Sequence, residues 1–159
     1  MNSKDRVLQR ERERGKADAL NLAERAVNMD GTAIIAEETK VPLFVWGTDY
    51  SSCPAGAPIG DIVDGELQIF TMITPVNTAH YPGITPNTER SLYSLCHTKD
   101  PKKAKHFISP LGISGLYNVD ECCVDNGRVW RNKHANNEYP PLALPERWED
   151  LGAVEDIQA

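Results

Sequence analysis

The chain has 159 residues, and its 17 lysines and arginines stand against 23 aspartates and glutamates, which gives a formal net charge of -6. This acidity argues against a protein that wraps nucleic acid, because phosphate binding requires a basic face. No stretch approaches the roughly 18 to 20 consecutive apolar residues that cross a bilayer, and the charged residues that follow Met1 do not form a secretory signal. We therefore expect synthesis in the cytoplasm, no membrane span and no nucleic-acid partner.

Residues 1–40 are predicted to form a helical anchor. The stretch from about Lys4 to Asn28 has no proline, one glycine and many good helix formers. Leu20, Ala23 and Val27 follow the spacing of an apolar stripe, whereas the earlier turns are mostly charged. Because so polar a helix is not stable by itself, we expect it to lie on another chain or to pair with its own copies.

A short second helix is predicted within the same segment. Asp30 offers an N-cap for a helix from Ala33 to Thr39, which Pro42 would stop. Ile34 and Ile35 would be its buried residues.

Residues 41–98 are predicted to form a first β-module. Val41 to Trp46 is a dense apolar entry, and Phe44 and Trp46 are interpreted as core residues more than as a ligand platform. The module then shows a characteristic order of tyrosine, glycine, apolar run, proline and aromatic residue: Tyr50, Gly65, Leu67 to Phe70, Pro86 and Tyr93.

Residues 99–112 are predicted to be a linker with a short helix. Asp100 would cap it, with Pro101 in its first turn. Phe107 and Ile108 would anchor the linker to the modules.

Residues 113–152 are predicted to form a second β-module, followed by a C-terminal segment of residues 153–159. Asp125, Asn126 and Gly127 form a hairpin-turn sequence between two short apolar runs. Adjacent Cys122 and Cys123 would point to opposite faces of a strand, so one is expected in the core and the other on the surface. The predicted structural core residues of the two modules are Tyr50, Tyr117, Trp130 and Trp148.

The order of residues from Ile113 to Gly152 resembles the chitin-binding-type carbohydrate-binding module, whose short chain runs tyrosine, Gly-Asp, apolar residue, glycine, aromatic residue, proline and tryptophan. This chain has Asp120-Glu121 where the family has Gly-Asp. The first module reads as a looser copy of the same pattern. The resemblance implies a small twisted antiparallel sheet, so the fold class is mainly β, with two small antiparallel β-modules and an N-terminal α-helical segment. Because modules of this size have thin cores, we expect contacts between them or assembly.

The two-module arrangement from Asp30 to Gly152 is similar to a family of tail-associated proteins encoded by bacteriophages and prophages of gut Firmicutes, usually described as carbohydrate-binding. The resemblance implies a structural component of a phage tail or baseplate, located in the virion and acting as adaptor or decoration. Other tail or baseplate proteins would be its partners. It also implies a homo-oligomer, with a trimer as the first guess from the symmetry of tails.

Binding is predicted in preference to catalysis. The sequence has no motif that holds a nucleophile, base or metal in fixed geometry, and its four cysteines lack zinc-site spacing. We expect no enzyme activity, no metal and no cofactor. The alternative function is binding of host cell-surface polysaccharide during adsorption, by aromatic residues that stack on sugar rings. The candidate carbohydrate-binding residues are His80, Tyr81, His134 and Tyr139.

Overall fold

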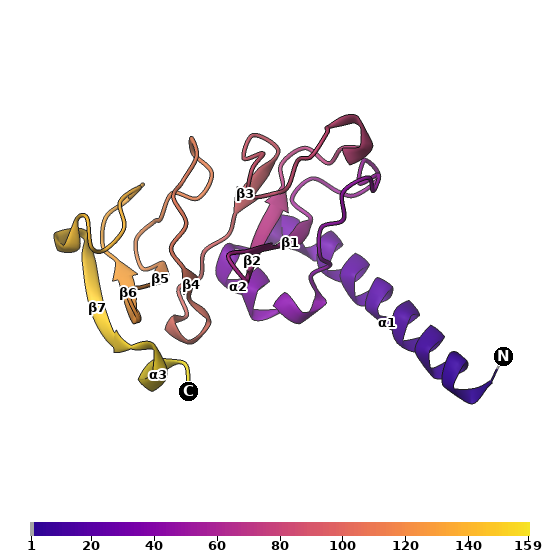
Figure 1. The fold of residues 1–159 in the computed structure, drawn as a ribbon, viewed down its shortest axis with the longest axis horizontal. Helices are drawn as coiled ribbons and strands as arrows, with labels where there is room; N and C mark the ends of the chain where they lie inside the picture. The colour runs from indigo at the N-terminus through magenta and orange to yellow at the C-terminus, as the bar shows by residue number, and fades with distance from the viewer. Residues whose placement is uncertain (1) are drawn as a thin grey trace.

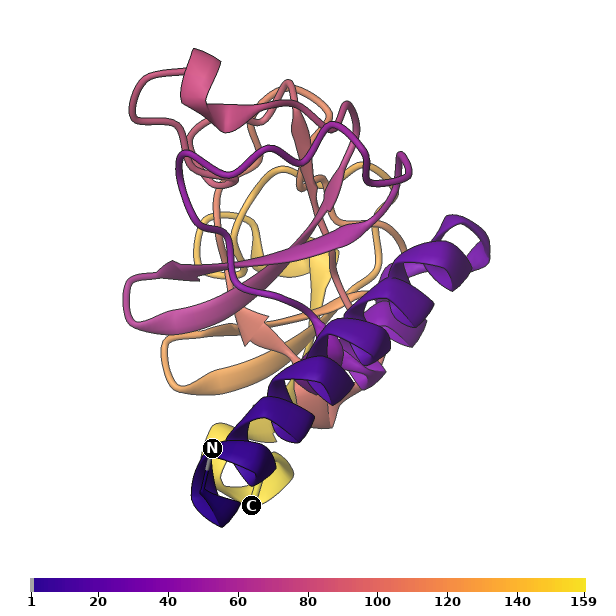
Figure 2. The same ribbon diagram turned by 90° about the vertical axis from the view of Figure 1, so that its right-hand side faces the viewer.

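The computed structural model describes residues 2–159, and its three parts follow one another along the long axis of the molecule (Figure 1). A long N-terminal helix, α1 (Ser3–Arg25), leads into a first three-stranded sheet, and a second, four-stranded sheet lies beyond it. The view along the long axis shows α1 running obliquely across the end of the first module (Figure 2). In the part of the chain that is described, every helix is too short or too polar to span a bilayer.

The N-terminal helix forms where the composition predicted it. The side chain of Asn2 caps α1 by accepting a hydrogen bond from the amide of Asp5 at 2.8 Å. A 3-10 turn, η1 (Ala26–Asn28), ends the segment. Leu22 and Ala26 are buried against the first module, whereas residues 3–18 are exposed. Only the last turns of α1 therefore dock on the body.

The second helix is α2 (Gly31–Ala36), followed by the 3-10 turn η2 (Glu38–Lys40). Its predicted cap is confirmed, because Asp30 accepts from the amide of Ala33 at 2.9 Å. Ile34 and Ile35 are buried as predicted. They pack with Leu22 and Ala26 against one face of the first sheet.

The first sheet has the antiparallel order β1-β2-β3, with β1 (Pro58–Val63), β2 (Glu66–Met72) and β3 (Tyr93–Leu95). Asp64 and Gly65 join β1 to β2 with positive φ at both positions, as a two-residue hairpin turn with the right twist requires. Both faces of this sheet are covered. Ile69 faces the helices, and a second cluster, on the opposite face, contains Ile59, Phe70, Met72, Tyr93 and Leu95.

The second sheet has the order β4-β5-β6-β7, with β4 (Lys105–His106), β5 (Cys122–Asp125), β6 (Arg128–Asn132) and β7 (Trp148–Ala153). Asn126 and Gly127 form the predicted turn, with φ of 50° and 73°. The pairing is mostly antiparallel, but β4 runs parallel to β5. The segment expected to be a linker thus supplies an edge strand, and its predicted capped turn is η4 (Pro101–Lys103).

The cysteine prediction was wrong, because Cys122 and Cys123 are both buried. The residues beyond the second module form a short helix, α3 (Val154–Ile157), which folds back beside β7. Cys122 packs in a cluster with Val124 and Val129, to which α3 adds apolar side chains. Cys123 packs on the other face with Tyr117 and Trp148. Alternation along the strand holds, but both faces of the sheet are covered.

The two modules are joined by a packed junction. The rings of His97 and Tyr117 stack with centroids 3.6 Å apart, and Phe107 stacks on Tyr117 at 5.3 Å. Ser114 caps the outer edge of β3, since its hydroxyl donates to the carbonyl of Tyr93 at 2.9 Å and accepts from the amide of Leu95 at 3.2 Å. These contacts hold the two modules against each other.

Candidate functional site

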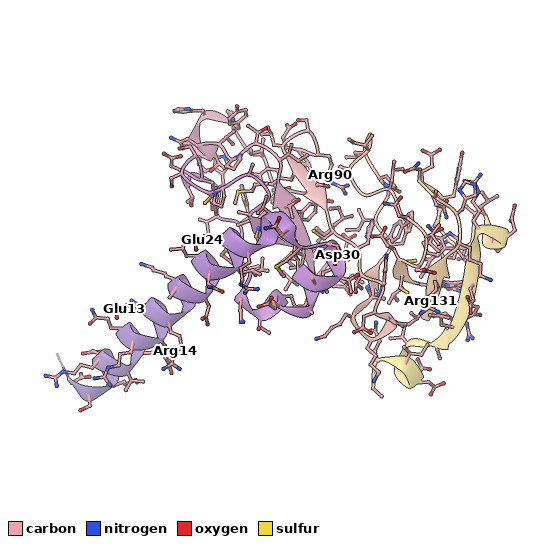
Figure 3. The ribbon with its side chains drawn as sticks, turned by 180° about the vertical axis from the view of Figure 1, so that it is seen from behind. Glu13, Arg14, Glu24, Asp30, Arg90 and Arg131 are labelled. Carbon is pink, nitrogen blue, oxygen red and sulfur yellow. The ribbon has the colours of Figure 1, made fainter. Side chains whose placement is uncertain are left out.

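The projecting part of α1, residues 3–18, is the first candidate surface. Figure 3 shows Glu13 and Arg14 on this part of the helix, well away from the sheets. The predicted assembly stripe is divided: Leu20 and Val27 are 58% and 65% exposed, whereas Ala23 packs against the core of the first module. The residue that anchors the helix is Leu22, which is fully buried and which the sequence prediction missed. Its 3,4 spacing to Ala19 and Ala26 was the available signal.

Trp46 provides an exposed aromatic surface on the first module. The prediction that Trp46 is a core residue was wrong, because its side chain is 51% exposed. Its indole Nε1 donates to the carbonyl of Tyr81 at 2.9 Å, and the adjacent amide of Gly47 donates to the buried hydroxyl of Thr78 at 2.8 Å. The indole is thus held by its edge. Tyr81 is 38% exposed and His80 beside it is also exposed.

The second module carries the other two predicted carbohydrate-binding residues. Tyr139 is 43% exposed, and the guanidinium of Arg147 lies 5.5 Å from the centroid of its ring. The carbonyl of Tyr139 accepts from Trp148 Nε1 at 3.0 Å. His134 is exposed, and its Nδ1 lies 2.8 Å from the carbonyl of Ala135.

The two loops share a hydrogen-bonding pattern. Asn77 and Asn137 each accept a bond from the amide two residues later, and each begins a loop in which a tyrosine carbonyl receives an indole N–H. His80 and Tyr81 nevertheless belong to the first module, and His134 and Tyr139 to the second. The four predicted residues therefore form two separate surfaces.

The predicted structural core residues differ in depth. Tyr117 and Trp148 are buried, at 1% and 5% exposure, and their ring centroids lie 5.2 Å apart. Trp130 is half-buried beside them, and its Nε1 donates to the carbonyl of Asp125 at 3.1 Å. Tyr50 is half-buried and stacks on Phe44 at 5.9 Å.

A cleft of about 370 Å³ lies between the modules, and the sequence prediction missed it. Its walls come from segments far apart in the chain: the start of α2, the strand β3 and the loop before β5. Gly31 permits this close approach, because a side chain there would collide with the carbonyl of His97. At the mouth, the turn from Leu111 to Ser114 is closed by two backbone hydrogen bonds of 3.0 and 3.1 Å and displays Ile113, which is 88% exposed.

Glu121 gives this cleft its charge. One of its oxygens accepts from the amide of Asn118 at 2.6 Å, and the other makes no hydrogen bond within residues 2–159. Burial raises the pKa of Glu121, Lys99 opposes this shift, and Asp30 adds to it. Figure 3 shows Asp30 on the junction side of the first module. The cleft therefore combines an incompletely bonded carboxylate with walls that carry both polar and apolar side chains.

The other titratable groups of the cleft are uncharged near neutral pH. Burial raises the pKa of the Cys96 thiol to about 12, so it is not a thiolate nucleophile near neutral pH. Burial also lowers the pKa of His97 to about 4, and its Nε2–H donates to the carbonyl of Gly115 at 2.8 Å. Within the described residues, no group of three histidine, cysteine or acidic side chains is placed to hold a metal ion.

Comparisons with known proteins add no relative. No protein-family model, curated protein or solved structure matches the chain. The molecule offers three candidate surfaces: the projecting helix, the aromatic loop of the first module and the cleft that holds Glu121.

Proposed function

We propose that the protein is a structural component of a bacteriophage tail or baseplate, in which α1 is the anchor and the two joined modules form an adaptor or decoration. The observation that carries the proposal is the exposed stretch of α1, residues 3–18, which extends from a packed body. A charged helix of this length is marginal alone in water, so contact with another chain supports its order. The virion context rests on the sequence resemblance. Other tail or baseplate proteins would then be its partners.

Deletion of residues 2–18 tests the anchor. We expect the truncated protein to keep the melting temperature of the body, because Leu22 and Ala26 remain docked, and to be lost from purified particles in mass spectrometry. A full-length variant with the exposed Leu142→Ala substitution is the control and should be incorporated normally. Normal incorporation of the truncated protein would refute the anchor role.

A second candidate function is binding of host cell-surface polysaccharide during adsorption, at the Trp46 and Tyr81 surface. It is favoured by one observation: the indole of Trp46 is half-exposed yet held by its edge through the bond to Tyr81. A fixed aromatic face loses little conformational entropy when a sugar ring stacks on it. The protein would then both assemble into the particle and contact the cell.

Cell-wall pull-down at micromolar protein tests this candidate. Trp46→Ala should abolish retention, whereas Tyr139→Ala, which removes an exposed aromatic residue from the other module, should retain binding. Equal retention of the parent and the Trp46→Ala protein, or no retention of the parent, would refute the first-module site.

A further inference from the structure

The projecting part of α1 is poorly suited to pair with copies of itself. The residues that dock on the body lie in one row along the helix, Ala19, Leu22 and Ala26. At the same spacing, this row continues toward the N-terminus through Gly15, Arg12 and Leu8. A coiled-coil seam needs apolar residues at successive positions of such a row. In the projecting part this row offers one large apolar residue, Leu8, because the other one, Val7, lies outside the row. The helix therefore needs a partner surface that supplies apolar area and acidic groups.

The charge distribution points to the body of the same protein. Residues 2–18 contain six basic and four acidic side chains, a net charge of +2. Because the whole chain carries -6, residues 19–159 carry -8. The body of a second copy thus has a net charge opposite to that of the helix, and such complementarity favours encounter.

The cleft between the modules offers one acidic side chain, that of Glu121, to such a helix. Leu8 and Arg12 lie one turn apart on the same face of α1. The cleft places the exposed Ile113 and the apolar Leu116 beside Glu121, whose second oxygen lacks a hydrogen bond within residues 2–159. A volume of about 370 Å³ admits a pair of long side chains, whereas a whole helix, about 10 Å wide, would lie across the mouth.

We propose that the protein assembles head to tail, with Leu8 and Arg12 of one copy entering the inter-module cleft of the next. Leu8 contacts Ile113, and the guanidinium of Arg12 bonds the carboxylate of Glu121. This inference rests on the proposed anchor role of α1 and names its partner as a second copy. A head-to-tail contact uses two different surfaces, so it closes into a ring when the rotation between copies permits.

The test is a mixing experiment on two full-length charge-reversal variants, followed by light scattering and sedimentation. Arg12→Glu has a defective helix and an intact cleft, whereas Glu121→Lys has an intact helix and a defective cleft. Each variant alone should associate at least about tenfold more weakly than the parent. The mixture should form a one-to-one heterodimer, because one intact helix meets one intact cleft. Arg10→Glu, on the opposite face of α1, is the matched control and should associate like the parent.

Further measurements separate the outcomes. The Arg12→Glu, Glu121→Arg double variant should recover association with the opposite charge order. If Glu121→Lys lowers the melting temperature, Glu121→Gln replaces it, since an amide oxygen still accepts from the amide of Asn118. A parent that stays monomeric, a mixture that fails to associate, or association unaffected by the Glu121 variants would overturn the proposal. The particle-incorporation experiment on the truncated protein is a separate measurement from these association experiments. One proposal, the anchor role or the head-to-tail contact, can therefore be refuted without the other.

Discussion

Trp148 is a large buried aromatic residue in the core of the second module. Its ring meets Tyr117 and Phe107 edge to face, and its indole N–H is bonded to Tyr139. We expect Trp148→Ala to lower the free energy of unfolding by roughly 3 to 5 kcal/mol, as for other large buried aromatic residues. Urea denaturation measures the change. Trp46→Ala is the matched control, and because Trp46 is half-exposed it should cost much less; equal losses would show that Trp148 is not a core residue.

His97 should make stability depend on pH. Its ordinary pKa is 6.5, and burial lowers the pKa in the folded protein to about 4. Between these two pH values the unfolded chain therefore binds a proton at His97, whereas the folded protein does not. Stability is fully present above pH 6.5 and falls as the pH drops toward 4, by roughly 3 kcal/mol in total.

Urea denaturation at pH 7.5 and pH 4.5 checks the His97 prediction. In a His97→Gln variant, which keeps a donor for the carbonyl of Gly115, the loss between these two pH values should shrink. Glu37, whose pKa is lowered to about 2 by hydrogen bonds from Arg25 and Lys40, loses its stabilising contribution only below its ordinary pKa of 4.5, outside this interval. An unchanged pH dependence in His97→Gln would contradict the assignment.

At the scale of elements, α1 is attached by one row of side chains. Leu22 is fully buried and Leu20 is 58% exposed, although the two residues are only two positions apart. Leu22→Ala should lower the free energy of unfolding by roughly 2 to 5 kcal/mol, whereas Leu20→Ala should change it by about 0.5 kcal/mol or less. Thermal or urea denaturation of the two variants measures these changes in the free energy of unfolding. The reverse order would mean that the helix docks through its other face.

The sequence predicted elements where the determining contacts are local. The cap at Asp30, the turn at Asn126-Gly127 and the polar helix each depend on neighbouring residues, and the structure confirms them. The burial of Cys122 depends on α3, which returns to the sheet from the end of the chain. The exposure of Trp46 depends on which side of its loop the first sheet covers. The order of apolar residues in the sequence therefore does not predict the burial of Cys122 or the exposure of Trp46.

One candidate site could be predicted from the sequence and another could not. The projecting helix was predicted from its composition, because an exposed helix is recognised by its charges alone. The cleft was not predicted, because it brings Gly31, His97 and Glu121 together from three separate segments. In the sequence, Glu121 stands where the resembled pattern has an aspartate. Its partial burial comes from the junction between the modules, which no single segment specifies.

At the scale of the whole molecule, the junction should make the two modules unfold together. Besides the stacked rings of His97 and Tyr117, the guanidinium of Arg90 donates to the carbonyl of Ser114 at 3.2 Å, and the amide of His106 donates to Glu66 at 2.8 Å. Each module alone has a thin core. We therefore expect one cooperative transition.

Two probes in a Trp46→Phe variant check the cooperativity. Its fluorescence follows the second module, which holds Trp130 and Trp148, while far-ultraviolet circular dichroism follows chiefly the helices at the other end of the molecule. Coincident midpoints in urea are expected. Two separated midpoints would show that the modules are independent domains joined by a weak contact.

The straightness of α1 also has a mechanical consequence. At 1.5 Å per residue, the exposed stretch of residues 3–18 spans roughly 24 Å, and in the proposed anchor role this length would set the distance between the attachment point and the two modules. Gly15 lies near the inner end of this stretch, with open space around it. Because glycine lowers helix stability by about 1 kcal/mol relative to alanine, we expect the helix to unwind first at Gly15 when it is pulled.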